Sequence, residues 1–317
     1  MFALITGAAG QDGWFLADQL LARGWRVRST SLAESDFAPD HRARDGELGC
    51  LDVTDAALVT STLEELRPDV IFHLAGLSSV GGSWARPADY LTANTVGTCT
   101  LLAAVNQLRT SGIDHPFIVN ASSAEVFAED APLPFSETTP LNPLNPYGVS
   151  KVAAQFMLGA FRAQGLLGSN AILFNHESHL RPATFVTGKI VRGVARIHAG
   201  LADELVLGNL AARRDWLHAS DVAAAMIAIA DRRAAQDFVV ASGVSRTVGD
   251  FVAAAFASVG IANWQDFIRT DPALLRATDA PELRGDSSLL TATTGWRPQR
   301  QFEEWVGEMV ERAPLDD

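Results

Sequence analysis

Thr6-Gly7-Ala8-Ala9-Gly10-Gln11-Asp12-Gly13 is the stretch that decides the fold, because it joins a short apolar run to an amphipathic helical pattern. The glycines of such a strand-to-helix turn have separate uses. Gly7 permits the tight turn, Gly10 lets the backbone approach a diphosphate, and Gly13 allows the helix to pack closely. The helix N-terminus offers N–H groups and partial positive charge to an anion. This context favours a dinucleotide-binding turn over a glycine turn that only ends a strand.

Short apolar runs alternate with helical patterns over the first half of the chain, which is typical of βαβ units on a parallel sheet. The predicted strands cover residues 2–6, 25–30, 70–74, 117–121 and 170–174. The predicted helices cover residues 13–23, 56–66, 90–108 and 147–163. We therefore expect an α/β fold, a doubly wound parallel Rossmann sheet.

The pattern loosens after residue 174. Residues 175–218 and 264–298 are rich in Arg, Pro and Gly, whereas residues 220–231 and 247–259 have helical patterns. This organisation suggests a small lobe that closes over a ligand. We expect a dinucleotide-binding Rossmann domain at residues 1–174 and a mainly substrate-binding lobe, partly interleaved with it, at residues 175–317.

The composition bears on the class of partner and on the compartment. A formal net charge of −12 argues against nucleic acid or an anionic membrane as a partner. There is no signal-peptide pattern and no apolar run of about 20 residues, so a cytoplasmic location is expected. Cys50 and Cys99 are too few for a disulfide scaffold and are expected to be buried, reduced thiols. The seven His residues show no metal-ligand spacing, so we expect no metal site.

The end of the second predicted strand bears on the choice of dinucleotide. An acid there would bind the ribose 2′-OH of NAD, and an Arg would bind the phosphate of NADP. The chain has Arg28-Ser29-Thr30-Ser31-Leu32, with neither residue at the expected place. Arg28 is either a phosphate ligand or a surface strand residue, and the residues alone leave the choice open. Asp52 is placed to meet the adenine, although a loop acid can also simply cap a helix.

Two hydroxyls, a carboxylate and a cation form the catalytic hypothesis. Tyr147 and Lys151 are four residues apart in a predicted helix, so they project from one face. A cation lowers the pKa of a nearby phenol. Bringing the pKa of a Tyr from about 10 to near 7 needs a shift of roughly three pKa units, or about 4 kcal/mol. Lys151 and the positive nicotinamide ring are expected to supply this, while Ser123 hydrogen-bonds the same substrate oxygen. Glu125 adds a second base beside a newly formed ketone, which elimination requires and oxidation alone does not.

The predicted cofactor contacts come from the glycine turn, the strand ends and the catalytic helix: Gly7, Gly10, Gln11, Asp12, Gly13, Asp52, Val53, Leu74, Ala75, Tyr147 and Lys151. Glu137 and Glu177 are alternative carboxylates for the catalytic role. Only Glu125 lies beside the hydroxyl of Ser123, and this favours it as the base.

The glycine turn, the Ser-Ser pair and the Tyr-x-x-x-Lys spacing resemble the extended short-chain dehydrogenase/reductase superfamily. Nearly the whole chain is similar to its GDP-mannose 4,6-dehydratase family, notably at residues 135–140, 173–178, 184–190, 208–216 and 283–286. The resemblance implies that Ser123 and Glu125 are the hydroxyl–carboxylate pair, Tyr147 the base and Lys151 its partner.

The same resemblance implies that Asn175, Lys189, Arg214 and Arg276 bind the nucleotide diphosphate and sugar, and we place Ser78 with them. Arg forks and a Lys charge suit a diphosphate. The chain departs from the family where basic residues are usual, at Ser31-Leu32-Ala33 and at Gly188. These departures bear on the dinucleotide, the nucleotide base and the sugar.

The resemblance therefore implies removal of water across C5 and C6 of a nucleotide-diphosphate sugar, with GDP-mannose as the expected substrate. NADP is the expected cofactor, with NAD as the alternative, and it should stay tightly bound because each turnover regenerates it. The alternatives are a 4-epimerase or 4-ketoreductase on the same scaffold and, more remotely, a non-catalytic NAD(P)-sensing protein. A homodimer or homotetramer is expected through the helices at residues 90–108 and 147–163.

Overall fold

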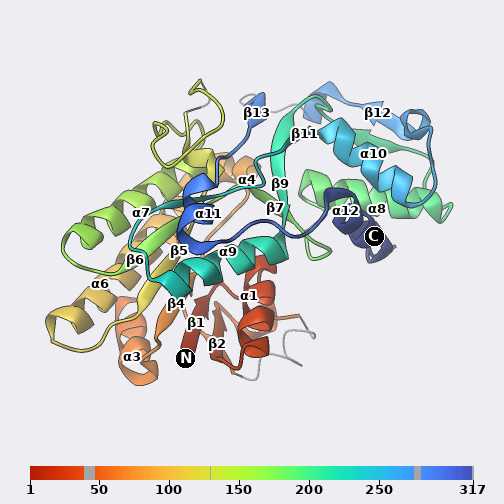
Figure 1. The fold of residues 1–317 in the computed structure, drawn as a ribbon. Coiled ribbons are helices and arrows are strands. Elements are labelled where there is room, and N and C mark those ends of the chain that lie inside the picture. Colours follow the sequence, from red (N-terminus) through yellow and green to blue (C-terminus); the bar gives the residue numbers. More distant parts are fainter. Residues whose placement is uncertain (39–46, 129, 275–279, 316–317) are drawn as a thin grey trace.

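A computed structural model shows a seven-stranded parallel sheet with helices on both faces, and a smaller group of helices and strands beside it (Figure 1). The structure describes residues 1–38, 47–128, 130–274 and 280–315. The strand order is β10-β6-β5-β4-β1-β2-β3, and all neighbours are parallel. The strands are β1 (Phe2–Thr6), β2 (Arg26–Ser31), β3 (Leu48–Cys50), β4 (Val70–His73), β5 (Phe117–Ser123), β6 (Gly168–Leu173) and β10 (Phe238–Val240). The predicted doubly wound α/β fold is confirmed.

The strand order reverses between β1 and β4, and in open α/β sheets ligands bind at the carboxyl ends of such strands. The five predicted strands are all present with small shifts in their bounds. One shift matters for the site, because β5 continues to Ser123 and so places that hydroxyl at a strand end. The strands β3 and β10 escaped prediction because three residues are too few to show a period.

Helices α1 (Gln11–Ala22) and α9 (Ala219–Arg232) cover one face of the sheet, and α3 (Ala56–Leu66), α6 (Gly97–Thr110) and α7 (Pro146–Ala163) cover the other (Figure 1). Apolar side chains of each helix pack on the strands, such as Leu16 from α1 and Leu158 from α7. The helix predicted at residues 90–108 has three parts: α5 (Pro87–Tyr90), a π-helical turn η2 (Leu91–Val96) and α6.

The smaller group has its own apolar cluster, built on α8 (Val186–His198), α10 (Val248–Ser258) and α12 (Phe302–Glu311). Its strands are β8 (Leu205–Leu207) and β12 (Ile268–Thr270). Between this group and the main sheet lies β9 (Arg213–His218), which pairs with β7 (Asn175–Glu177), β11 (Ser245–Thr247) and β13 (Glu282–Leu283). Because α9 and β10 pack with the main sheet, the chain after residue 174 serves both parts, and the two-domain division stays a prediction.

The remaining short elements lie in the connections: η1 (Glu34–Asp36), α4 (Val80–Ala85), η3 (Ala124–Val126), η4 (Trp264–Phe267), η5 (Pro272–Leu274) and α11 (Ser288–Thr294). Among the described residues, no helix is long and apolar enough to cross a membrane.

The prediction that both cysteines are buried was wrong. Cys50 is exposed and Cys99 is half-buried, and both are free thiols. The reason for Cys50 is its position at the end of β3, the edge strand of the sheet, where it lies on the solvent side. Cys99 lies in α6, where partial burial raises the pKa of its thiol.

Candidate active site

A cavity of about 850 Å³ opens at the carboxyl ends of β1 and β4. It brings together every residue predicted to be catalytic and every residue predicted to contact the cofactor. From the dinucleotide set, these are Gly7, Gly10, Gln11, Asp12, Gly13, Asp52, Val53, Leu74 and Ala75, and from the catalytic set Ser123, Glu125, Tyr147 and Lys151.

The glycine turn fits a diphosphate for steric reasons. Gly7 has a φ of +70°, and a Cβ on it would lie 2.6 Å from the backbone of Ala75. A Cβ on Gly13 would lie 2.4 Å from the carbonyl oxygen of Ala8. Gly10 is the N-cap of α1 and provides no side-chain cap, so the first N–H groups of the helix remain for a ligand. The helix begins at Gln11, two residues earlier than predicted, which brings Gln11 and Asp12 into its first turn.

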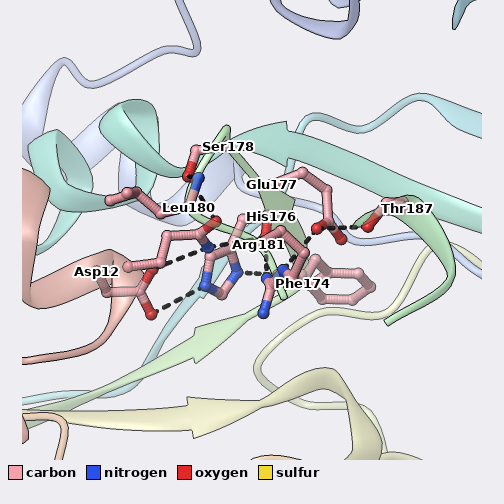
Figure 2. Close-up of polar contacts among 9 residues, drawn as sticks. Asp12, Phe174, His176, Glu177, Ser178, Leu180, Arg181 and Thr187 are labelled. Atoms are coloured by element: carbon pink, nitrogen blue, oxygen red, sulfur yellow. Dashed lines mark hydrogen bonds and ion pairs between the residues drawn. The ribbon is translucent and has the colours of Figure 1, made fainter. Parts of the chain in front are cut away.

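Asp12 ties this turn to β7, as Figure 2 shows. Its Oδ2 lies 3.0 Å from Nε2 of His176. Burial would raise the pKa of Asp12, but His176, together with smaller contributions from Arg181 and Gln11, outweighs burial and holds the pKa below its usual range. Conversely, burial would lower the pKa of His176, and the carboxylate of Asp12 raises it instead. Both directions favour the charged pair, so the turn and β7 are held together electrostatically.

A second group of contacts fixes the segment that follows β7. Arg181 donates through Nε to Oε2 of Glu177 at 2.6 Å and also donates to the carbonyl of His176 (Figure 2). Thr187 donates to the same carboxylate oxygen at 2.8 Å. Arg181 lines the cavity, and sequence reasoning missed it because the segment has no periodic pattern.

At the end of the cavity next to β2 and β3, the described lining residues include one acid, Asp52, and no Lys or Arg. Ser31 and Leu32 line it, and the Ser31 hydroxyl donates to Oδ2 of Asp36 at 2.7 Å. Hydrogen bonds from the Ala33 backbone and from Ser31 hold the pKa of Asp36 below its usual range, so it is ionised. Asp52 accepts from the backbone and hydroxyl of Thr54, at 2.9 and 2.7 Å.

Arg28 does not reach this end of the cavity. Its guanidinium lies against Gly49 of β3, where a Cβ would meet it at 2.4 Å, and it is not among the lining residues. The structure therefore favours the interpretation of Arg28 as a surface strand residue over its interpretation as a phosphate ligand.

Ser123, Tyr147 and Lys151 meet at the junction of β5 and α7. Tyr147 follows Pro146, whose fixed φ suits the first helical position, and Lys151 lies one turn further on. Nζ of Lys151 donates to the carbonyl of Ala121 at 2.9 Å and lies 5.9 Å from the centroid of the Tyr147 ring. Ser123 accepts a hydrogen bond from the backbone N–H of Glu125 at 3.2 Å, which leaves its own proton to donate.

Burial dominates the electrostatics of this set. Burial raises the pKa of Tyr147 to about 12, against a smaller lowering by a hydrogen bond with Ser123. Burial also lowers the pKa of Lys151 to about 8. In the ligand-free chain, the pKa of the phenol is therefore not brought towards neutrality.

Of the three carboxylates considered for the catalytic role, Glu125 is the one that lies beside Ser123 at the cavity. It is half-buried at the cavity, and its Oε2 accepts from Nδ2 of Asn145 at 2.8 Å. Glu177 is engaged by Arg181 and Thr187. Glu137 lies outside the cavity lining and accepts from the backbone N–H of Val239 at 2.8 Å. The two rival carboxylates therefore hold the fold.

The substrate set is only partly assembled. Ser78, Asn175 and Arg214 line the cavity, and Arg214 donates to the carbonyl of Ala280 at 2.8 Å. Lys189 lies half-buried in α8 and is not among the lining residues, so its role stays a prediction. Arg276 lies outside the described residues.

The glycine at position 188, where the family usually has a basic residue, is explained by a close backbone contact. A Cβ there would lie 2.3 Å from the carbonyl oxygen of Pro182, so no side chain fits at that position.

Asn94, in the π-helical turn, was also missed by sequence reasoning. It accepts from the backbone of Leu77 and donates to Ser150, each at 2.8 Å, and so joins the loop after β4 to α7. In the described ranges, no group of three or more His, Cys, Asp or Glu could hold a metal ion.

The doubly wound sheet, the glycine turn and the Ser-Tyr-Lys set define an enzyme of the extended short-chain dehydrogenase/reductase type with a nicotinamide cofactor. The chain belongs to the GDP-mannose 4,6 dehydratase family, whose family model matches residues 4–309. It is 38% identical to GDP-mannose 4,6 dehydratase 2 of Arabidopsis thaliana, over 98% of this chain and 86% of the relative.

Solved structures of related enzymes share the fold. The RMD protein of Pseudomonas aeruginosa, solved with NADPH, has a TM-score of 0.80 and 26% identity, covering 98% of each chain. The dTDP-glucose 4,6-dehydratase of Bacillus anthracis, solved with NAD, has a TM-score of 0.83 and 19% identity, covering 98% of this chain and 96% of that one.

The buried cation gives a test of the site without substrate. Replacing Lys151 by Met should stabilise the ligand-free protein, because a change in pKa from 10.5 to about 8 corresponds to about 3 kcal/mol of burial cost. Loss of the hydrogen bond to Ala121 offsets roughly 1–2 kcal/mol of this. Urea unfolding near pH 7 should therefore show a net gain of roughly 1–2 kcal/mol.

The sign of the pH dependence follows from the lowered pKa. Between about pH 8 and 10.5 the unfolded chain keeps a proton that folded wild type has lost, so wild-type stability rises with pH there. The advantage of Lys151→Met should shrink across this window. Lys189→Met, a change of a half-buried Lys outside the cavity lining, is the control and should show no such gain. An equal gain in unfolding free energy in both variants, or a gain that does not change with pH, would contradict a desolvation cost at Lys151.

Proposed function

We propose that the protein is a nucleotide-sugar 4,6-dehydratase that converts GDP-mannose to GDP-4-keto-6-deoxymannose by internal hydride transfer. The observation that carries the proposal is the position of Glu125, which lines the same cavity as Ser123, Tyr147 and Lys151. Oxidation uses the hydroxyl set, and elimination uses the additional carboxylate. Membership of the family supports the same reaction and the same substrate.

An oxidised nicotinamide dinucleotide would be held by the glycine turn, Tyr147 and Lys151, and it would supply a positive charge beside the phenol and a reversible hydride acceptor for the oxidation at C4 and the reduction at C6. Tyr147 takes the proton of the C4 hydroxyl, while Ser123 donates a hydrogen bond to the same oxygen. Glu125 then removes the C5 proton, which the new C4 ketone has acidified. Hydroxide leaves C6 as water with the proton that Glu125 took from C5, delivered by Glu125 or through Ser123. After the hydride has returned to C6, C5 receives one proton, equal to the one that Tyr147 took from the C4 hydroxyl, which completes the 4-keto-6-deoxy product and restores both bases.

Substrate binding is assigned to the cations and amides on the β7 and β9 side of the cavity. Arg214 and Asn175, which line the cavity, are proposed to contact the diphosphate and sugar. Lys189 and Arg276 are proposed to join them. The cytoplasmic location and the tight retention of the cofactor are further parts of this proposal.

For the dinucleotide, the described residues favour NAD over the NADP expected from the family resemblance. A 2′-phosphate would bring a charge of about −1.5 to −2 close to Ser31, which already donates to the ionised Asp36. The 2′-hydroxyl of a ribose can instead donate a hydrogen bond to the Ser31 hydroxyl oxygen or to the Asp36 carboxylate. Relatives of the same fold were solved with either dinucleotide, which leaves both open to this scaffold.

Binding of the two dinucleotides tests this preference. Wild type should bind NAD more tightly than NADP, and Asp36→Asn should improve the affinity for NADP severalfold because it removes a like charge. Isothermal titration of the two cofactors measures both effects. Asp114→Asn, a change of an exposed acid outside the cavity lining, is the control and should leave the ratio unaltered. Tighter binding of NADP by wild type would refute the preference.

The reaction is tested with GDP-mannose and no added reductant. Wild type should form a 4-keto-6-deoxy sugar, whereas a reductase would consume NADPH with a keto-sugar and an epimerase would change only the configuration at C4. Glu125→Gln should slow product formation by roughly 10²–10⁴-fold, the usual contribution of a general base. Reduction of the nicotinamide should remain detectable by its fluorescence.

Glu137→Gln is the matched control, because that carboxylate lies outside the cavity lining and its replacement keeps an acceptor for Val239. Normal turnover by Glu125→Gln would overturn the mechanism. Absence of any turnover or of any nucleotide-sugar binding by wild type would instead favour the non-catalytic NAD(P)-sensing protein.

We further propose that α7 and the helices before it form a homodimer interface, within a dimer or a tetramer. Val149 and Phe156 lie seven residues apart on one face of α7 and are 45% and 63% exposed. Val96 in the adjoining π-helical turn is 47% exposed.

A charge at this surface should dissociate the oligomer. Phe156→Glu should lower the molar mass measured by light scattering to that of one chain. Leu201→Glu, a change of another exposed apolar residue far from α7 in sequence and 55% exposed, is the control and should leave the mass unchanged. A monomeric wild type, or an unchanged mass for Phe156→Glu, would exclude this interface.

A further inference from the structure

Asn145 makes two hydrogen bonds that join the catalytic carboxylate to the catalytic helix. Its Oδ1 accepts from the backbone N–H of Gly148 at 2.8 Å and so caps α7. Its Nδ2 donates to Oε2 of Glu125 at 2.8 Å. The side chain is only 7% exposed. An amide carries its acceptor and its donor on two separate atoms. An Asp carboxylate has no donor, and the single hydroxyl of a Ser is too short to bridge Gly148 and Glu125, so either cap could make the first bond but not the second.

The backbone makes the same connection independently. A Cβ on Gly148 would lie 2.4 Å from the carbonyl oxygen of Glu125, so the first turn of α7 rests directly on η3. The N–H of Glu125 is held from the other side by Oγ of Ser123. Glu125 is therefore held at its N–H by Ser123 and at its carboxylate by Asn145, and its carbonyl packs against Gly148.

We propose that Asn145 is a positioning residue that sets Glu125 for removal of the C5 proton, an inference that rests on the proposed dehydratase function. A Glu side chain has three rotatable bonds, and the bond from Asn145 to Oε2 orients the carboxylate so that Oε1 can face the substrate. The same amide caps the turn that carries Tyr147, so one side chain links the carboxylate of Glu125 to the first turn of α7. Misplacing a reacting group by about 1 Å can cost roughly 10²-fold in rate.

Two substitutions separate this role from capping. Asn145→Ser keeps a hydroxyl cap for Gly148 but is too short to reach Glu125. Asn145→Asp keeps the cap oxygen but loses the donor and puts a carboxylate against Glu125. Each variant is mixed with GDP-mannose, and three quantities are measured: reduction of the bound nicotinamide, exchange of the C5 proton with solvent deuterium, and product formation.

In both variants, the rate of nicotinamide reduction should stay within about twofold of the wild-type rate, and the KM for GDP-mannose should equal that of wild type. Exchange at C5 and product formation should both fall by roughly 10- to 100-fold. Thr247→Ala is the matched control, because it removes the N-cap of α10 outside the cavity lining and should leave all three rates unchanged.

The positioning role is overturned if Asn145→Ser exchanges the C5 proton at the wild-type rate, since a loss in Asn145→Asp alone would reflect charge repulsion. It is also overturned if reduction and exchange fall by the same factor with a raised KM, which would indicate a general loosening of α7. Failure of wild type to form the 4-keto-6-deoxy sugar would instead refute the dehydratase function and, with it, this role. An active wild type with unaffected variants refutes the role of Asn145 alone.

Discussion

Close approach of backbones at the carboxyl end of the sheet is the constraint on which the site depends. A Cβ at Gly7 would lie 2.6 Å from the backbone of Ala75, so the turn after β1 and the loop after β4 meet only with glycine there. This contact places the N-terminus of α1 over the crevice where the strand order reverses. Gly148 makes the equivalent contact with Glu125 across the cavity. Two contacts that admit no side chain therefore bring the glycine turn and Glu125 to one cavity.

The fold was predictable where its elements are long and periodic. The five longest parallel strands and the helices of residues 13–23, 56–66 and 147–163 follow from apolar spacing, with bounds shifted by at most two residues. The three-residue strands β3 and β10 have no measurable period, and the π-helical turn η2 looks like ordinary helix in a sequence. Cys50 was misjudged because an edge position depends on the order of strands, which no local pattern reports.

The site was predictable where spacing expresses its chemistry. Tyr147 and Lys151 are neighbours on one helix, and Ser123 and Glu125 are neighbours at one strand end, so their meeting needed only the parallel sheet. Asn145, Asn94 and Arg181 were missed because their partners are distant in the chain or lie in irregular segments. The phenol also behaves differently from expectation, because burial rather than Lys151 dominates its pKa. Desolvation depends on the whole packed structure, and no motif encodes it.

The packing of α1 under α9 also affects how the chain is made. Phe15, Leu16 and Leu20 of α1 belong to a cluster completed by α9, which begins at Ala219. At a synthesis rate of about 5–20 residues per second, the ribosome needs roughly 10–40 seconds to deliver that helix after α1 has emerged. Through this interval the nascent chain carries an uncovered apolar stripe, a target for chaperones and for aggregation. Substitutions in α9 at positions outside the cavity are therefore expected to lower the yield of folded protein before they change the activity of the molecules that do fold.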